Sequence, residues 1–162
     1  MIFSSIEFLI FFSLFLILIK ILPNFQRIII IFSSLFFYSF WNPIFLPLIL
    51  YFLGISYFFV KKKISLKISI PIILLPLFYF KYSYFICEIT NLNSLDKFAY
   101  NSELPLAISF VTFTIIALLI DVKTRKYNQQ TNFASLSEFL IYFPQLIAGP
   151  ILRAKELIPG LN

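Results

Sequence analysis

Five residues between positions 144 and 153 have types and a spacing that point to a specialised site: Pro144, Gln145, Gly149, Pro150 and Arg153. They interrupt a stretch that is otherwise apolar enough to lie in a lipid bilayer. A proline removes a backbone donor and clashes with the preceding turn of a helix, yet every backbone polar group inside lipid must find a partner. The segment therefore requires other protein, or a water-filled cavity, around it.

Gln145 and Arg153 are the side chains of this segment that could line such a cavity, because polar and charged groups at membrane depth tend to face a cavity or a partner. Each has an alternative role. Gln145 can hydrogen-bond to a carbonyl that Pro144 or Pro150 leaves without its usual donor. Arg153 can lie at the membrane interface and reach lipid phosphates. Gly149 can allow two helices to approach closely instead of admitting a ligand.

The rest of the sequence contains few other reactive groups. Histidine is absent, and Cys87 is the one cysteine, so the chain has no internal disulfide and no metal-ligand spacing. We therefore expect neither a metal nor a cofactor. Asp121 ends an apolar run beside basic residues. For this carboxylate a local ion pair, or a position at the lipid interface, is favoured over catalysis.

The composition places the chain among membrane proteins. Hydrophobic residues make up 60% of it and charged residues 12%, whereas about half of a typical soluble domain is apolar. The net charge of +6 is carried by residues between the apolar runs. This placement favours a role in membrane orientation, with the lipid bilayer as partner, over binding to nucleic acid.

The apolar runs predict an all-α integral membrane protein with about five to six short, proline-broken transmembrane helices in one domain, residues 1–162. The expected spans are 6–22, 28–41, 44–60, 68–86 and 104–120, followed by a re-entrant or partial helix at 138–152. The last element is too short and too broken to cross a bilayer by itself. Because it needs protein on all sides, the helices together indicate an incomplete bundle.

Charge indicates how the chain crosses the membrane. Lys20 and Arg27 precede the long apolar region 28–60, and Lys61, Lys62 and Lys63 follow it. Two crossings, with a turn at residues 41–43, place both basic groups on the cytoplasmic face, as the positive-inside rule prefers. One crossing would separate them. The pattern therefore predicts a multi-pass protein with an exterior N-terminus.

The segment Phe143-Pro144-Gln145, followed by Ala148-Gly149-Pro150 and Arg153, resembles a motif of the membrane-bound O-acyltransferase family. The branch it is most similar to is the bacterial one typified by alginate O-acetyltransferase. Residues 1–5 and 104–122 also resemble that branch, in the same order along the chain. One departure is Ala107, where relatives usually carry a glycine. The resemblance covers the whole chain and implies the N-terminal part of an incomplete bundle of this family.

The resemblance also implies a function. Family members transfer an acyl group from a thioester donor to a hydroxyl, here an acetyl group to an exported polysaccharide such as alginate at the bacterial inner membrane. Their expected general base is a histidine in the C-terminal half. Since this chain has no histidine, we expect it to contain no catalytic residue and to be inactive alone. The missing C-terminal half would supply the base, and this half, or companion membrane or periplasmic acylation proteins, would be the partner.

Within that resemblance, Pro144, Gln145, Gly149, Pro150 and Arg153 are the residues expected to line a substrate tunnel. Arg153 would hold an anionic donor, such as the phosphate of phosphopantetheine, or pair with a carboxylate from the missing half. The alternative to an enzyme part is a non-catalytic membrane scaffold subunit or a transporter component.

Overall fold

The computed structural model describes residues 5–90, 104–124 and 132–148, and this part of the chain is helical with no strand. The predicted all-α class is therefore confirmed. The helices are α1 (Ile6–Ile21), α2 (Gln26–Trp41), α3 (Leu46–Lys62), α4 (Leu66–Thr90), α6 (Ile108–Lys123), α7 (Phe133–Ile141) and α8 (Phe143–Ala148).

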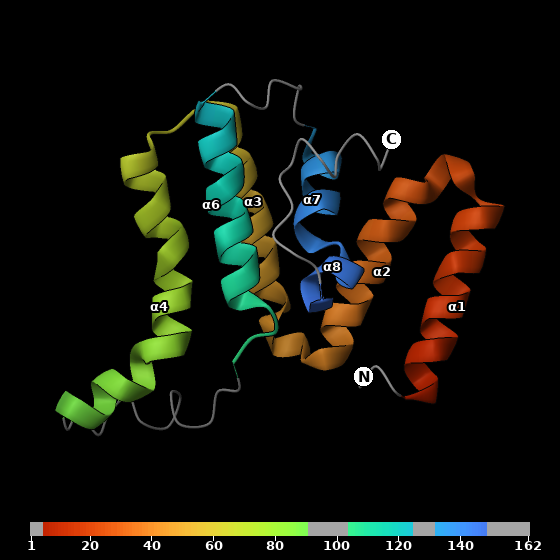
Figure 1. Ribbon diagram of the computed structural model, residues 1–162, viewed down its shortest axis with the longest axis horizontal. Coiled ribbons are helices and arrows are strands. Elements are labelled where there is room, and N and C mark those ends of the chain that lie inside the picture. Colours follow the sequence, from red (N-terminus) through yellow and green to blue (C-terminus); the bar gives the residue numbers. More distant parts are fainter. Residues whose placement is uncertain (1–4, 91–103, 125–131, 149–162) are drawn as a thin grey trace.

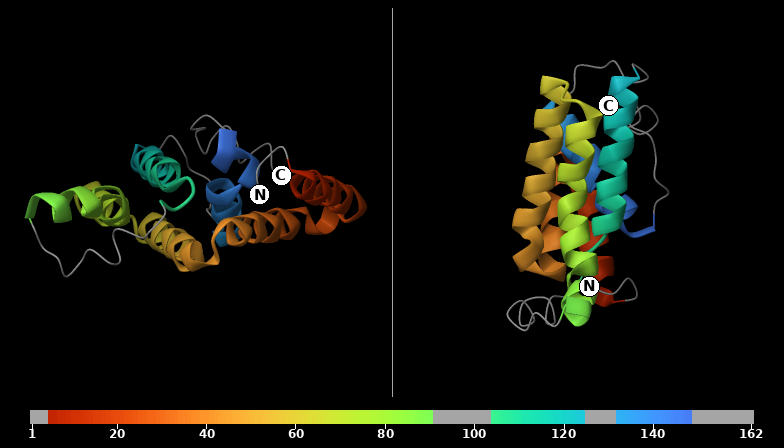
Figure 2. Two further views of the ribbon diagram at one scale, coloured as in Figure 1. Left: turned by 90° about the horizontal axis from the view of Figure 1, so that it is seen from below. Right: turned by 90° about the vertical axis from the view of Figure 1, so that its left-hand side faces the viewer.

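The first four helices form a curved row, and α6 and α7 lie together on one side of it (Figure 1, Figure 2). Neighbouring helices in the row run in opposite directions. Helix α7 is in the middle of the assembly, where it packs mainly against α2 and also against α3 and α6. Helix α1 is at the end of the row and packs on α2.

Prolines mark the turns between the first three helices. Short 3-10 turns begin at Pro23 and Pro43, where a proline fits because the first N–H groups of a helix have no partner within it. At the second turn the Asn42 side chain accepts a hydrogen bond from the Ile44 amide at 3.1 Å. The turn expected at residues 41–43 therefore lies between α2 and α3. Inside α4, by contrast, Pro71 and Pro76 are tolerated without a break in the assigned helix.

Helix length limits what each element could cross. In the described residues the segment Pro43–Lys62 is long and apolar enough to span a bilayer, and α1 and α2 meet that criterion only together, across a bend of 109°. A helix of 16 residues such as α1 is about 24 Å long, less than the hydrocarbon thickness of about 30 Å. The helices thus cover most of the predicted spans, but several are short.

Most basic residues in the described part of the chain gather at one end of the helix row; Lys81, four turns into α4, is an exception. This end holds the last turns of α1, α3 and α6 and the first turns of α2, α4 and α7 (Figure 1). These turns carry the basic side chains Lys20, Arg27, Lys61, Lys62, Lys67 and Lys123. Because α2 and α3 run in opposite directions, the two basic groups that flank them lie at the same end.

Ala107, immediately before α6, has a φ angle of 56°. A side chain in this left-handed region is strained, and glycine is the residue that adopts it freely. This φ angle is a physical reason to expect a glycine here, as the resemblance implies. Ala107 is therefore a strained start to α6, the helix that packs on α3, α4 and α7.

Candidate functional site at the break between α7 and α8

The segment singled out from the sequence begins at a helix break. Helix α7 ends at Ile141, Tyr142 leaves the helical conformation with ψ 105°, and α8 starts at Phe143. Pro144 is the second residue of α8, a position where its missing N–H costs no helical hydrogen bond. The backbone N–H of Gln145 closes the turn by donating a hydrogen bond to the Tyr142 carbonyl at 3.0 Å. The break thus follows directly from the position of Pro144.

Protein surrounds the described part of this segment. Phe143 is 1% exposed, Gln145 is 6% exposed, and Pro144 is half-buried. The backbone break is therefore shielded, as its apolar sequence requires. The other three candidate residues, Gly149, Pro150 and Arg153, lie outside the described residues.

Phe143 is held in a socket of aromatic rings from α1 and α2. Its ring centroid lies 5.0 Å from that of Phe15, 5.3 Å from Phe11, 5.5 Å from Phe37 and 6.4 Å from Phe12. Three of these pairs, those with residues of α1, meet edge to face, a favourable arrangement for aromatic rings. The socket ties α8 to the outer helix of the row.

A buried serine satisfies the backbone at the break. The Phe143 amide donates a hydrogen bond to Ser34 Oγ at 3.2 Å, and the Ser34 hydroxyl donates to the Ile30 carbonyl at 2.7 Å. Ser34 is 1% exposed. Its hydroxyl oxygen therefore accepts a hydrogen bond from the first N–H of α8, a group that has no partner within its own helix.

An ion pair between the partly exposed Arg27 and the buried Glu138 joins α7 to α2. Arg27 Nε lies 3.3 Å from Glu138 Oε2, and the two side chains are 37% and 2% exposed. Glu138 lies outside the five predicted spans. Burial raises the pKa of its carboxyl above the usual range, and the Arg27 guanidinium opposes that rise. The second oxygen, Oε1, has no hydrogen-bond partner among the described residues.

The sequence carries one signal that indicates this pair. Glu138 is the one charged residue in the helix Phe133–Ile141, and a charge within an apolar element usually has a partner. The sequence pattern predicts a helix that starts at Glu138, whereas in the structure the helix begins earlier, at Phe133, after Asn132. Ser34 was not singled out, since a serine in an apolar helix gives no comparable signal.

Helix α6 contributes further buried polar groups. Thr114 is 1% exposed and Asp121 is 5% exposed, and neither Thr114 Oγ1 nor Asp121 Oδ2 has a hydrogen-bond partner in the described part of the chain. The two residues are two turns apart, so they lie on one face of the helix. Asp121 is thus buried, whereas a place at the lipid interface would leave it exposed.

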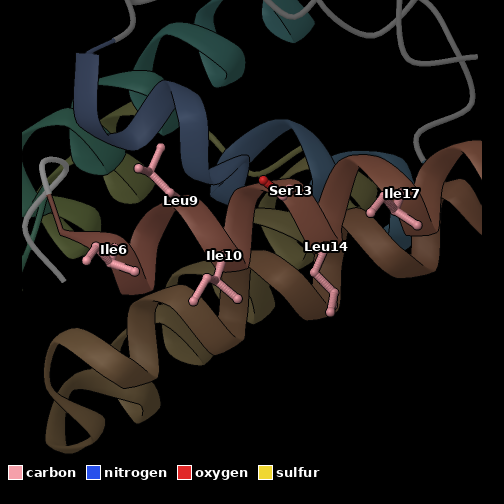
Figure 3. A pocket seen from close by; sticks show the side chains of 6 residues that line it. All are labelled: Ile6, Leu9, Ile10, Ser13, Leu14 and Ile17. Carbon is pink, nitrogen blue, oxygen red and sulfur yellow. The ribbon is translucent and has the colours of Figure 1, made fainter.

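The outer side of α1 carries a shallow apolar groove of about 370 Å³ (Figure 3). Its lining recurs every three or four residues along the helix: Ile6, Leu9, Ile10, Ser13, Leu14 and Ile17. Apart from the Ser13 hydroxyl, these side chains have no polar group that could bind or activate a substrate. The groove therefore offers apolar contact and no chemistry.

The chain is similar to curated proteins from several bacteria. It is 35% identical, over 85% of its length, to a protein named peptidoglycan O-acetyltransferase from Helicobacter pylori. It is 31% identical, over 86% of its length, to a probable alginate O-acetylase AlgI from Pseudomonas aeruginosa, and 30% identical, over its full length, to the protein of that name from Azotobacter vinelandii. The chain belongs to the membrane-bound O-acyltransferase family.

Membership of this family confirms the resemblance that the motif at Pro144 indicated. The chain spans about a third of the length of these relatives: 33%, 30% and 36%, respectively. No family model matches the chain, and no solved structure matches it. The geometry described above therefore corresponds to about a third of each of these relatives.

Proposed function

We propose that this chain forms part of the site of an O-acyltransferase that transfers an acetyl group from a thioester donor to a hydroxyl of an exported polysaccharide. The observation that supports this most is the 35% identity to the peptidoglycan O-acetyltransferase of Helicobacter pylori over 85% of the chain. In this proposal Pro144, Gln145, Gly149, Pro150 and Arg153 line the path of the substrate, with Arg153 on the anionic donor.

The chain alone is inactive in this proposal. Deprotonating an alcohol requires a base that titrates near neutral pH, and the 162 residues contain no histidine. In this proposal the base comes from protein that corresponds to the share of the relatives that these residues do not span. The low exposure of Gln145 supports a role inside a packed or enclosed site.

We further propose that the protein lies in the bacterial inner membrane with an exterior N-terminus. Two observations support this orientation. Apart from Lys81 of α4, the basic side chains of α1, α2, α3, α4 and α6 belong to turns at one end of the row, which the positive-inside rule assigns to the cytoplasm. Large apolar side chains are exposed along the helices, for example Leu14 at 55%, Phe36 at 56% and Leu75 at 64%.

Removal of the chain from the bacterium that encodes it tests the function. We expect the O-acetyl esters released from surface polysaccharide by mild alkali to fall, and to return when the chain is supplied again. Unchanged ester content would contradict the proposal. It would favour a non-catalytic scaffold or transporter component, the alternative that the absence of histidine leaves open.

A biochemical assay tests the division of labour. The purified chain, given an acetyl thioester and a polysaccharide acceptor, should release no more free thiol than a blank. The same residues together with protein that corresponds to the rest of a relative should turn over. Turnover by the 162 residues alone would disprove the requirement for that further protein.

A further inference from the structure

One face of α2 contacts the α7–α8 segment at several positions along the helix. Arg27, Ile30, Ser34 and Phe37 follow one another at intervals of three or four residues, which places them on one side of the helix. Arg27 pairs with Glu138 at 3.3 Å, Ser34 accepts from the Phe143 amide at 3.2 Å, and Phe37 meets the Phe143 ring at 5.5 Å. Ile30 packs in the same cluster as Phe143.

The two polar contacts are well separated along both partners. Residues 27 and 34 are about 10 Å apart along α2, and the residues they contact, Glu138 and Phe143, lie on either side of the break. A slip of α7 by one helical turn, about 5.4 Å, would break both contacts at once. It would leave a buried carboxylate and a buried N–H without partners.

The aromatic socket holds Phe143 in this same register, but the apolar contacts of α7 itself do not select the register as strictly. Hydrophobic attraction is non-directional and depends on the area buried, and both α2 and α7 present apolar residues on either side of the two contacts. A shifted α7 would therefore recover much of its apolar burial. The unpartnered charge and amide would be costly in any shifted position.

We propose that Arg27 and Ser34 are positioning residues that fix the register of α7–α8 on α2 and thereby place Gln145 for the transfer reaction. As far as it concerns the reaction, this inference rests on the proposed function. Gln145 follows Phe143 by two residues, and its backbone N–H donates a hydrogen bond to the Tyr142 carbonyl in the same turn. Any shift at the Ser34 contact is therefore passed directly to Gln145.

Thiol labelling in membranes tests the register without needing activity. In a Cys87→Ser background, the reporter Ile141→Cys replaces a side chain 2% exposed beside the break, and the control reporter Ile73→Cys replaces one 0% exposed on α4. Buried thiols react slowly. We expect Ser34→Ala to speed labelling at 141 about fivefold, the factor that corresponds to a lost hydrogen bond of about 1 kcal/mol.

Arg27→Gln should have the larger effect, about a hundredfold, because it leaves Glu138 buried without its counter-ion. Adding Glu138→Gln should reverse most of that increase. The matched control is Ser33→Ala, on the adjacent half-buried position of α2, which should not change the rate. In every variant the reporter at 73 should stay protected.

Two labelling outcomes would overturn the inference. In one, Ser34→Ala behaves like Ser33→Ala. In the other, labelling speeds up at position 73 together with position 141, which indicates general unfolding and not a specific change of register.

Polysaccharide acetylation in cells tests the link to the reaction. Ser34→Ala should lower ester content and Ser34→Thr, which keeps the hydroxyl, should restore it. Normal ester content with Ser34→Ala, where removal of the chain abolishes it, would overturn the positioning role and leave the proposed function standing. If removal of the chain has no effect, the proposed function fails, and labelling still decides the register.

Discussion

Helices α1 and α7 are opposites in burial and composition. Helix α1 has 16 residues, nearly all apolar, yet Phe15 is its one buried residue. Helix α7 has nine residues, and the six from Leu136 to Ile141, Ser137 and Glu138 among them, are all buried. The more polar helix is thus inside and the more apolar one is outside. A water-soluble protein would bury the apolar helix first, so the arrangement supports a bilayer as the surrounding solvent.

The difference between α1 and the interior would be contradicted if outer and inner apolar side chains contributed equally to the free energy of unfolding. Phe143→Ala should lower the free energy of unfolding by about 4 kcal/mol, because it empties a socket between rings of α1 and α2. Leu14→Ala on α1, where the side chain is 55% exposed, should change it by less than about 0.5 kcal/mol. Denaturant unfolding in detergent micelles measures both. Equal losses would mean that α1 is packed against something further.

The next largest expected difference is in the free energy of unfolding when a partly buried or an exposed charged residue is replaced. Arg27→Met should cost about 3 kcal/mol, since it removes the counter-ion of a buried carboxylate while Arg27 itself is partly exposed. Lys20→Met, at the exposed end of α1, should be close to neutral.

The Arg27→Met loss should also depend on pH. Burial raises the pKa of Glu138, and a carboxyl with a raised folded-state pKa stabilises below its ordinary pKa and loses that contribution as the pH rises. The variant should therefore be less destabilised near about pH 4 than near about pH 7. A loss that is independent of pH would exclude an uncompensated Glu138 as its cause.

Matched serines sharpen the contrast further. Ser137→Leu on α7 should cost about 1–2 kcal/mol, because a larger side chain must fit where the serine is 1% exposed. Ser13→Leu on the exposed side of α1 should stay within about 0.5 kcal/mol. Thermal unfolding followed by circular dichroism compares the two. Similar shifts in midpoint temperature would contradict the inside–outside difference.

The smallest effect concerns the backbone that leads into α6, a neighbour of α7 and not of α1. Ala107→Gly should stabilise the protein by about 0.5 kcal/mol, because relief of the strained φ angle outweighs the added freedom of the unfolded chain. Ala117→Gly, within α6, should destabilise by about 1 kcal/mol. Both values can be read from the same unfolding curves. Destabilisation by Ala107→Gly would show that the φ angle is not strained.

Local chemistry predicted much of the fold. Pro23, Pro43 and Pro144 each stand at a turn or break, since the effect of proline on a helix depends only on its neighbours. Apolar length predicted helices over most of the described residues. Helix α7 starts at Phe133 and not at the predicted position 138, because packing against α2 and α3 keeps the preceding residues helical.

The contacts that build the candidate site could not be predicted from the sequence. Ser34 and Phe143 are 109 residues apart, and Arg27 and Glu138 are similarly distant. Nothing in the neighbours of Ser34 indicates which N–H its hydroxyl will serve. Such pairings depend on how α7 enters the row of helices, a global property of the fold, whereas the break at Pro144 is a local one.

The Arg27–Glu138 pair has a consequence for biogenesis. Ribosomes make the chain from its N-terminus, so the arginine is already in place when the acidic residue emerges. The carboxylate can then leave water together with its counter-ion, so the earlier helix lowers the energetic barrier to packing α7 into the bundle. A circularly permuted chain that makes α7 first would have to bury that charge alone.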